Sequence, residues 1–312
     1  MNATFQSTVS YAQLISSGLS PSEIQSSIKK GHIIRLRHGV YRPGGTLDPV
    51  MEHRHLIHCT APLVSDASVF AHVSAAILHE LPVPNEALTR CHMIRSTEGH
   101  GNSSRRLLVR KMRLAQDEVE TIDGFRVTSL ARTAADLART LPFVWGVAAC
   151  DAALRQGLEP AELWHAVTRY ERLRGAPRAR AVAEFADPRS ESPAESISRA
   201  QFLRHGIPAP ELQFEVINDL GVVVARSDFA WPELGLVGEV DGRSKYGALL
   251  TPGQTADAAI MNEKRREEEI RLAGYWLVRW DWNLCLHGAD LAQRIRRAAE
   301  AQRRPSGVSL SR

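Results

Sequence analysis

The sequence predicts an α+β protein of several domains, with a winged helix-turn-helix at the N-terminus, a mixed α/β segment in the middle and an α/β domain at the C-terminus. Three observations support this fold class. The first forty-odd residues have the order helix, helix, basic hairpin, the middle mixes helix and strand patterns, and the last third alternates helices with short strands. A chain of 312 residues is also too long for a single core. The expected parts are residues 1–48, 49–175, a linker at 176–190, and 191–312.

Composition and charge narrow the class of protein. No apolar run approaches the ~18 residues that a membrane span needs, and the N-terminus lacks the pattern of a signal peptide, so we expect a cytoplasmic protein with no membrane partner. A pI of about 9.0 permits nucleic acid as a partner without requiring it. The cysteines form no CxxC pair, and we expect reduced core thiols at Cys59, Cys91, Cys150 and Cys285.

The winged helix is predicted from local signals at the N-terminus. Residues 11–18 predict a short helix, and a capping box formed by Ser20 and Glu23 begins a second one. The chain continues as two short strands joined by a tight turn at His38 and Gly39. This order of elements is typical of a winged helix-turn-helix.

The second helix and the hairpin carry basic residues and no acid between Gln25 and Arg42. A winged helix contacts DNA through these two elements, which favours phosphate binding. The alternative is a solvated basic face of a small helical domain. The candidate DNA-binding residues are Lys29, Lys30, Arg35, Arg37 and Arg42.

The middle segment contains no catalytic constellation. Three histidines, His53, His55 and His58, could be ligands of a metal ion. No complete ligand set is nearby in the sequence, so a packed or solvated helix explains the triplet better. Asp123 and Gly124 predict a hairpin turn.

The C-terminal domain carries acidic residues whose spacing suggests a metal-binding or catalytic site. A four-residue turn after Trp231 sets that residue opposite Leu236, and the same register sets Asp228 opposite Glu239. Asp241 follows on the same face of its strand, so three acids are expected to converge. Like charges in such a cluster need a cation nearby.

Two cations are available for this cluster. Arg226 lies opposite Asp241 in the expected register and can form an ion pair with it. Alternatively, carboxylates on rigid strands suit Mg²⁺ or Mn²⁺. Both alternatives stay open at the level of the sequence.

Several motifs resemble known families over most of the chain. The strings SPAES, R-x-DFAWP, E-x-DG-x-x-KY, EKRR and G-Y-x-x-VRWDW resemble the domain of unknown function 559 family, which is related to the very-short-patch-repair endonucleases of the PD-(D/E)XK superfamily. The hairpin HGVYRPGG resembles the winged-helix domain of AbiEi-type antitoxins. The motif H-x-SAA-x-LH-x-LPVP resembles the segment between them. The resemblance implies a restriction-endonuclease-like α/β fold at residues 191–312.

The resemblance also implies roles for the acids. Asp228 and Glu239 match the metal-binding acids of the superfamily, with Mg²⁺ or Mn²⁺ as cofactor. The superfamily usually has a lysine two residues after the glutamate, where this chain has Asp241. Lys245 and Lys264 are the candidate replacements that would orient or deprotonate the attacking water.

Glu195 has two explanations. It resembles the helix acid that often completes such sites, but it also forms a capping box with Ser192. Arg265, Arg266 and Arg279 are expected either to neutralise a phosphate backbone or, for the first two, to pair with glutamates along their helix.

Two functions therefore follow from the sequence. The first is a metal-dependent endodeoxyribonuclease, a hydrolase of phosphodiester bonds acting in phage defence or in a toxin–antitoxin system. The alternative is an AbiEi-type antitoxin and transcriptional regulator whose nuclease-like domain is an interaction module. A purely structural adaptor is a third alternative. The expected partners are DNA and either a cognate toxin or a second copy of the chain.

Overall fold

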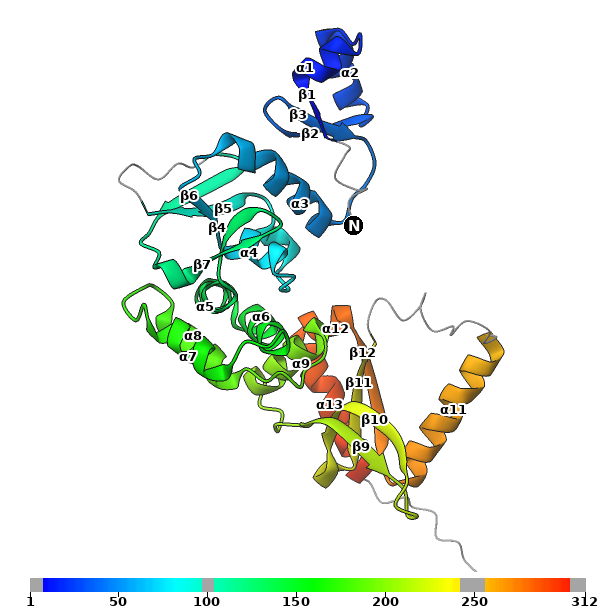
Figure 1. Ribbon diagram of the computed structural model, residues 1–312. Helices are drawn as coiled ribbons and strands as arrows, with labels where there is room; N and C mark the ends of the chain where they lie inside the picture. The colour runs from blue at the N-terminus through cyan, green and yellow to red at the C-terminus, as the bar shows by residue number, and fades with distance from the viewer. Residues whose placement is uncertain (1–7, 97–103, 242–255, 304–312) are drawn as a thin grey trace, which may run out of the picture. The chain divides into compact units, whose positions relative to one another are not determined.

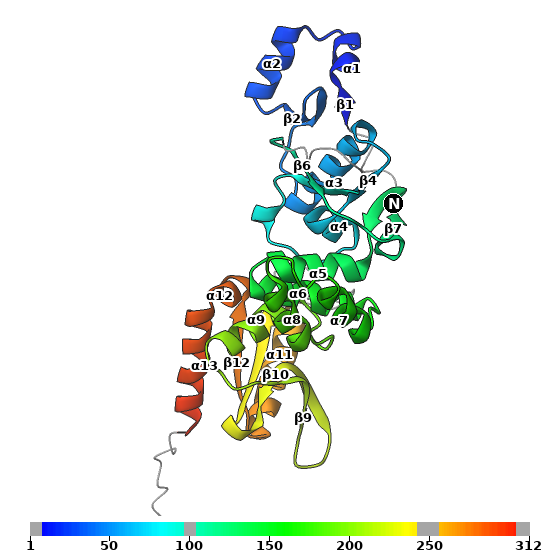
Figure 2. The ribbon, with the colours of Figure 1, turned by 90° about the vertical axis from the view of Figure 1, so that its left-hand side faces the viewer.

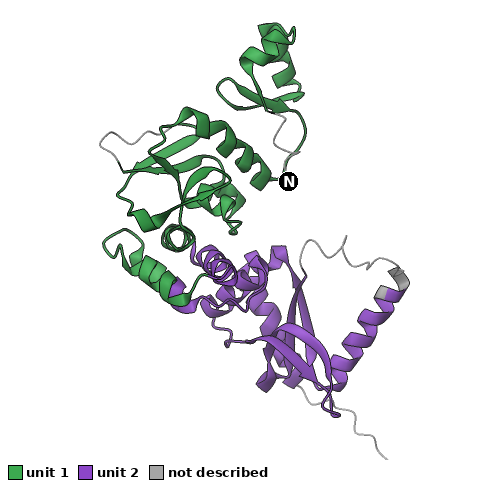
Figure 3. Ribbon diagram, viewed as in Figure 1, with its two compact units in different colours: residues 1–141, 158–180 green, residues 142–157, 181–312 purple. Residues whose placement is uncertain are grey.

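The chain folds into two compact units, which are described separately. The computed structural model describes residues 8–96, 104–241 and 256–303 (Figure 1). Unit 1 comprises residues 1–141 and 158–180, and unit 2 comprises residues 142–157 and 181–312 (Figure 3). Within the described ranges, no helix has the length and apolar content needed to cross a membrane. All four cysteines are buried, free thiols, as expected.

The N-terminal part of unit 1 has the predicted order of elements, preceded by a short strand that the sequence did not predict. The Ser20 side chain accepts the Glu23 N–H, and the Glu23 carboxylate accepts the Ser20 N–H, so the capping box is confirmed. Buried Leu14, Ile24 and Tyr41 form the core. The strand order is β1-β3-β2, and the elements are β1 (Val9–Ser10), α1 (Tyr11–Ser16), α2 (Pro21–Lys29), β2 (Ile33–Arg37) and β3 (Val40–Pro43).

The rest of unit 1 is a five-stranded sheet with helices, in the strand order β6-β5-β4-β8-β7. Helix α4 packs against α3, α5 and the strands β5 and β8. The predicted turn at Asp123 and Gly124 joins β7 to β8, and both residues have positive φ. The elements are α3 (Pro49–Thr60), β4 (Ser68–Phe70), α4 (His72–Leu78), β5 (Cys91–Arg95), β6 (Leu107–Lys111), β7 (Val119–Ile122), β8 (Phe125–Thr128), α5 (Leu130–Thr140) and α7 (Pro160–Thr168).

The segment at 176–190 differs from the linker that the sequence suggested. It contains helix α8 (Ala176–Phe185). Unit 2 also recruits helix α6 (Phe143–Arg155) from within the stretch expected to form the middle domain. The alanine-rich sequence of α6 gave no sign of this, because buried faces of helices look alike whichever unit they pack against.

Unit 2 is built on a four-stranded sheet of order β12-β11-β10-β9, in which only the β11–β12 pair is parallel. Trp231 lies opposite Leu236, so the predicted register is confirmed. Helices α6, α12 and α13 pack against α9, and Figure 2 shows α13 along one side of the sheet. The elements are α9 (Pro193–Arg204), β9 (Glu211–Ile217), β10 (Val223–Trp231), β11 (Leu236–Asp241), α11 (Ala256–Leu272), β12 (Trp276–Asp281), α12 (Trp282–Leu286) and α13 (Gly288–Arg303).

The two faces of this sheet have different cores. On one face, Phe202 of α9 packs edge-on against an aromatic group formed by Phe229, Trp231 and Trp280. Gly238 allows this packing, because a Cβ there would lie 2.7 Å from the Trp280 ring. Ile270 of α11 packs in a separate core cluster with Val216, Ala225, Ala230 and Val237.

Candidate functional site

Glu239, the central acid of the predicted metal site, is neutralised by two arginines. The residue is 7% exposed. Its carboxylate forms ion pairs with Arg266 of α11 and with Arg279 of β12, the latter at 3.2 Å from Nε. Burial acts to raise the pKa of Glu239, but the hydrogen bonds and charges of the two arginines outweigh it and hold the pKa below its ordinary value. The cations that neutralise Glu239 are therefore the side chains of Arg266 and Arg279.

The same arginines correct a second expectation. Arg279 also forms ion pairs with Glu263 and Glu267 of α11, and Arg266 pairs with Glu263 at 3.2 Å. The alternative that Arg266 pairs with a glutamate along its helix is confirmed, and neither guanidinium is left to neutralise a phosphate backbone. Lys264 and Arg265, by contrast, are exposed on α11.

Arg226 on β10 does not make the ion pair that the sequence suggested, and Asp228 on the same strand binds the backbone of β11. The Asp228 Oδ2 accepts a hydrogen bond of 2.8 Å from the Val240 N–H. Arg226 pairs with Glu191 at 2.8 Å, and the expected partner Asp241 is half-buried at the end of β11. The Arg226–Asp241 alternative is therefore wrong, because Glu191 reaches the guanidinium from the segment before α9.

Glu195 lies near this region and is 6% exposed. The Ser192 side chain accepts the Glu195 N–H, so Ser192 caps α9 as predicted. The Glu195 carboxylate does not close the capping box; it accepts hydrogen bonds from the Glu191 N–H and from Gln213 Nε2, at 2.8 and 2.9 Å. Burial and the charge of Asp228 raise the pKa of Glu195.

These residues do not fit a divalent metal ion as they are arranged. Glu239 gives both carboxylate oxygens to arginines, and Asp228 gives one oxygen to a backbone N–H. In the part of the chain that the structure describes, no three His, Cys, Asp or Glu side chains are grouped to hold a metal. Lys245 lies outside the described residues.

Three of the five candidate DNA-binding residues are available to a ligand. Lys29 and Lys30 are exposed at the end of α2, and Arg35 is exposed on β2. Among the described residues, none of the three is ion-paired with an acid. They form a positive surface on the two elements from which a winged helix contacts DNA.

The other two, Arg37 and Arg42, have structural roles. Arg37 donates a hydrogen bond of 3.2 Å to the Cys59 carbonyl in α3. Arg42 is 5% exposed and donates to the carbonyls of Pro43 and Gly45, both at 2.9 Å. Arg42 is therefore not available to a ligand, because the chain after β3 supplies backbone acceptors for it, and Arg37 is half-buried against α3.

The histidine triplet is packed, as expected. His53 is 1% exposed and uses both ring nitrogens, with Nδ1 2.9 Å from the Leu88 carbonyl and Nε2 2.9 Å from Ser74 Oγ. His55 is also buried, and His58 packs edge-on against the Phe125 ring at 4.9 Å between centroids.

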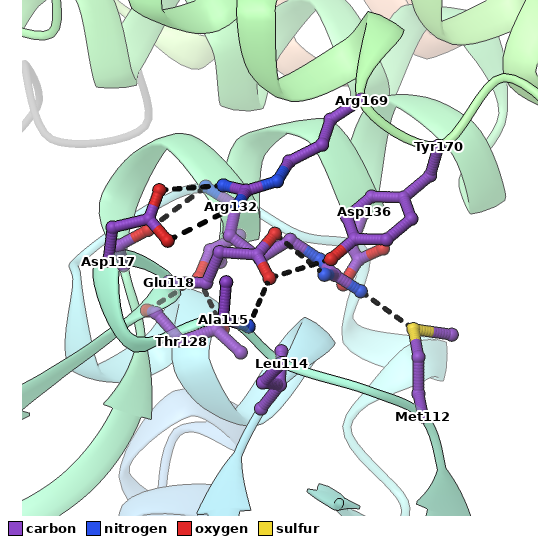
Figure 4. Close-up of polar contacts among 12 residues, drawn as sticks. Met112, Leu114, Ala115, Asp117, Glu118, Thr128, Arg132, Asp136, Arg169 and Tyr170 are labelled. Atoms are coloured by element: carbon purple, nitrogen blue, oxygen red, sulfur yellow. Dashed lines mark hydrogen bonds and ion pairs between the residues drawn. The ribbon is translucent and has the colours of Figure 1, made fainter.

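Unit 1 contains a buried charge network that the sequence did not reveal. Arg132 of α5 is 2% exposed and forms ion pairs with Glu118 at 2.9 Å and Asp136 at 3.0 Å (Figure 4). Its guanidinium lies 4.5 Å from the centre of the Tyr170 ring, and the Tyr170 hydroxyl donates to Glu118 at 2.7 Å. The network joins α5 to the segment after α7.

Unit 2 contains a comparable pair. Asp151 of α6 is fully buried and receives two hydrogen bonds, of 2.9 and 3.0 Å, from Arg199 of α9. The Asp187 N–H donates to the same carboxylate at 2.8 Å, and the Arg199 guanidinium lies 4.2 Å from the centre of the Phe185 ring. The charged groups of both networks pair with other groups of the same unit, which indicates a structural role.

Comparison with known proteins bears on the N-terminal surface. Residues 3–44 match the family model described as "Transcriptional regulator, AbiEi antitoxin". The N-terminal part of the chain is therefore similar to the AbiEi antitoxin family. This match covers α1, α2 and the β2–β3 hairpin, the elements that hold Lys29, Lys30 and Arg35. The resemblance of the C-terminal part to PD-(D/E)XK nucleases stays a prediction.

Two curated relatives are uncharacterized proteins of Mycobacterium tuberculosis, MT2308 and Rv2248. Each is 32% identical over 163 residues, which cover 48% of this chain and 60% of the relative. A solved structure, the RV2827C protein from the same organism, aligns over 62% of this chain and 75% of that chain with a TM-score of 0.37 and 14% identity. That similarity is too low to support an argument about function.

Proposed function

We propose that the chain is a DNA-binding transcriptional regulator of the antitoxin type, which binds duplex DNA through α2 and the β2–β3 hairpin. The observation that carries the proposal is that Lys29, Lys30 and Arg35 are exposed, without acidic partners among the described residues, on the domain that matches the AbiEi regulator family. Unpaired cations on a winged helix favour phosphate binding through release of counterions from the duplex.

The exposed face of α2 also suits base contacts. Ser22, Gln25, Ser26 and Lys29 follow the spacing i, i+3, i+4, i+7 and are all exposed, whereas Ile24 faces the core. A helix of this kind lies in the major groove, with its polar face toward the base edges. Gln25 can form a bidentate hydrogen-bond pair with adenine, so we expect α2 to supply part of the sequence preference.

Replacing Lys29, Lys30 and Arg35 together with glutamine is expected to weaken duplex binding and its dependence on salt. Removing one phosphate contact lowers the slope of log K against log salt by about 0.9. The measurement is fluorescence anisotropy with a duplex from the promoter region of the chain's own gene, titrated at several salt concentrations. A matched control replaces three exposed arginines of α13 with glutamine, namely Arg294, Arg297 and Arg303.

The two variants have the same change in net charge, so the comparison isolates the position of the charges. The proposal requires the α2–β2 variant to lose affinity and the α13 control to keep it. Equal binding by wild type and the α2–β2 variant would exclude these residues as the DNA-binding surface.

Metal-dependent hydrolysis of phosphodiester bonds, the first function suggested by the sequence, stays a prediction with a separate requirement. Glu239 would have to release Arg266 and Arg279 before it could bind Mg²⁺ or Mn²⁺. With the ion pairs in place, we expect the same thermal midpoint in EDTA and in millimolar Mn²⁺, because a ligand stabilises a protein only by binding the native state. A rise in the thermal midpoint with Mn²⁺ that is absent in Glu239→Ala would contradict this expectation. It would support metal binding at Glu239.

A further inference from the structure

A second basic surface lies on the five-stranded sheet of unit 1. Between Glu98 and Asp117 the sequence contains no acid. Within that interval the residues around β6 carry five positive charges, which we call the basic strip: Arg105, Arg106, Arg110, Lys111 and Arg113.

The basic strip is accessible because β6 is an edge strand. It pairs only with β5 in the described sheet. Arg106 is half-buried, and the other four members of the strip are exposed. No side chain of the strip forms an ion pair or a hydrogen bond with a residue that the structure describes. Other arginines of unit 1 are paired instead: Arg132 with Glu118, Arg139 with Asp136 and Arg169 with Asp117.

Protection of the sheet edge does not account for the whole strip. Charged residues on an edge strand prevent its pairing with a second sheet, and Arg110 and Lys111 at the end of β6 would serve this purpose. Arg105 and Arg113 lie outside the strand, where they protect no edge. Five like charges that form no ion pair with a described acid repel one another, which favours a polyanion as the partner.

The strip begins beside the winged helix. Arg106 and Leu36 of β2 line the same cleft, which has a volume of about 170 Å³. Arg37, next to Leu36, is fixed to α3 by its hydrogen bond to the Cys59 carbonyl. The strand itself spans about 17 Å at ~3.3 Å per residue, roughly half a helical turn of duplex DNA.

We propose that the basic strip binds backbone phosphates of the same duplex that the winged helix binds. This inference rests on the proposed function and extends its DNA-binding surface from one domain of unit 1 to two. Phosphate contacts carry no base information, so the strip adds affinity and salt dependence but no sequence preference.

The test uses the full chain with Arg105, Arg110, Lys111 and Arg113 replaced by glutamine. We expect the salt slope for a duplex several helical turns long to fall by up to about 0.9 for each phosphate that the variant no longer neutralises. The ratio of affinities for the promoter duplex and an unrelated duplex of the same length should stay unchanged. The thermal midpoint should also stay unchanged, because all four side chains are exposed.

Each outcome separates the inference from the proposed function. If wild type binds no duplex, the proposed function fails. If wild type binds and the strip variant keeps the full salt slope, the inference is overturned and the winged helix acts alone. The inference is also overturned if the α13 control, with its three replaced arginines, shows as large a fall in slope per charge as the strip variant, because the effect is then one of net charge.

Discussion

Replacing Arg132 with methionine is expected to lower the free energy of unfolding of unit 1 by about 3–5 kcal/mol, the usual cost of removing one partner from a buried ion pair. Asp136 would keep a partner in Arg139 at 3.0 Å. Glu118 would keep the Tyr170 hydroxyl but lose its buried cation. The cost is therefore expected to come mainly from a charged Glu118 left in a water-poor site.

Urea unfolding can assign this loss to unit 1. Five of the six tryptophans belong to unit 2, and only Trp164 belongs to unit 1. Arg132→Met should therefore shift the transition seen by far-ultraviolet circular dichroism more than the transition seen by tryptophan fluorescence. Arg169→Met is the control, because its partner Asp117 has a side chain that is 65% exposed and water screens the charges of such a pair. Equal losses in the two variants would show that burial of the network does not determine the cost.

Replacing Asp151 with alanine is expected to destabilise unit 2 by a similar amount, about 3–5 kcal/mol. The substitution leaves the Arg199 guanidinium buried without its carboxylate and leaves the Asp187 N–H without an acceptor. Because α6 and α9 are joined through this pair, their packing should loosen. The tryptophan-fluorescence transition should move to lower urea concentration.

Asp187→Asn provides the matched control for Asp151→Ala. The side chain of Asp187 pairs with Arg189, which is 65% exposed, so its loss should cost less than about 1 kcal/mol. The backbone N–H of residue 187, which donates to Asp151, is unchanged by this substitution. A loss at Asp151→Ala as small as that at Asp187→Asn would mean that the buried pair contributes little to stability.

Local signals predicted much of the fold. The capping box of Ser20 and Glu23, the cap at Ser192 and the turns at residues 38–39 and 123–124 involve neighbours in the sequence, and the structure confirms them. The register of Trp231 with Leu236 could also be predicted from the sequence, because the length of a turn fixes the pairing of the strands beside it.

The side chains that surround the candidate sites could not be predicted from local sequence patterns. Arg266 and Arg279 reach Glu239 from 27 and 40 residues away, across separate elements. Arg42 belongs to a basic hairpin in the sequence and is nevertheless buried against the chain that follows. Pattern analysis assigns a side chain to a face, but the partner that occupies this face depends on tertiary packing.

The basic strip around β6 appears in the sequence only as an interval without acids, a pattern that any solvated strand or loop can have. Its position on an edge strand is what distinguishes it. The edge position follows from the strand order of the sheet, which local patterns do not determine.

The division of the chain between the two units limits how the protein can be dissected. Because α6 belongs to unit 2 and residues 158–180 return to unit 1, the backbone passes from one unit to the other three times. No single cut releases both units intact. A fragment ending at residue 141 lacks Tyr170, and so exposes the network around Arg132. Unit 1 is consequently not expected to fold as an isolated fragment, and truncations designed from a linear domain map would remove part of its core.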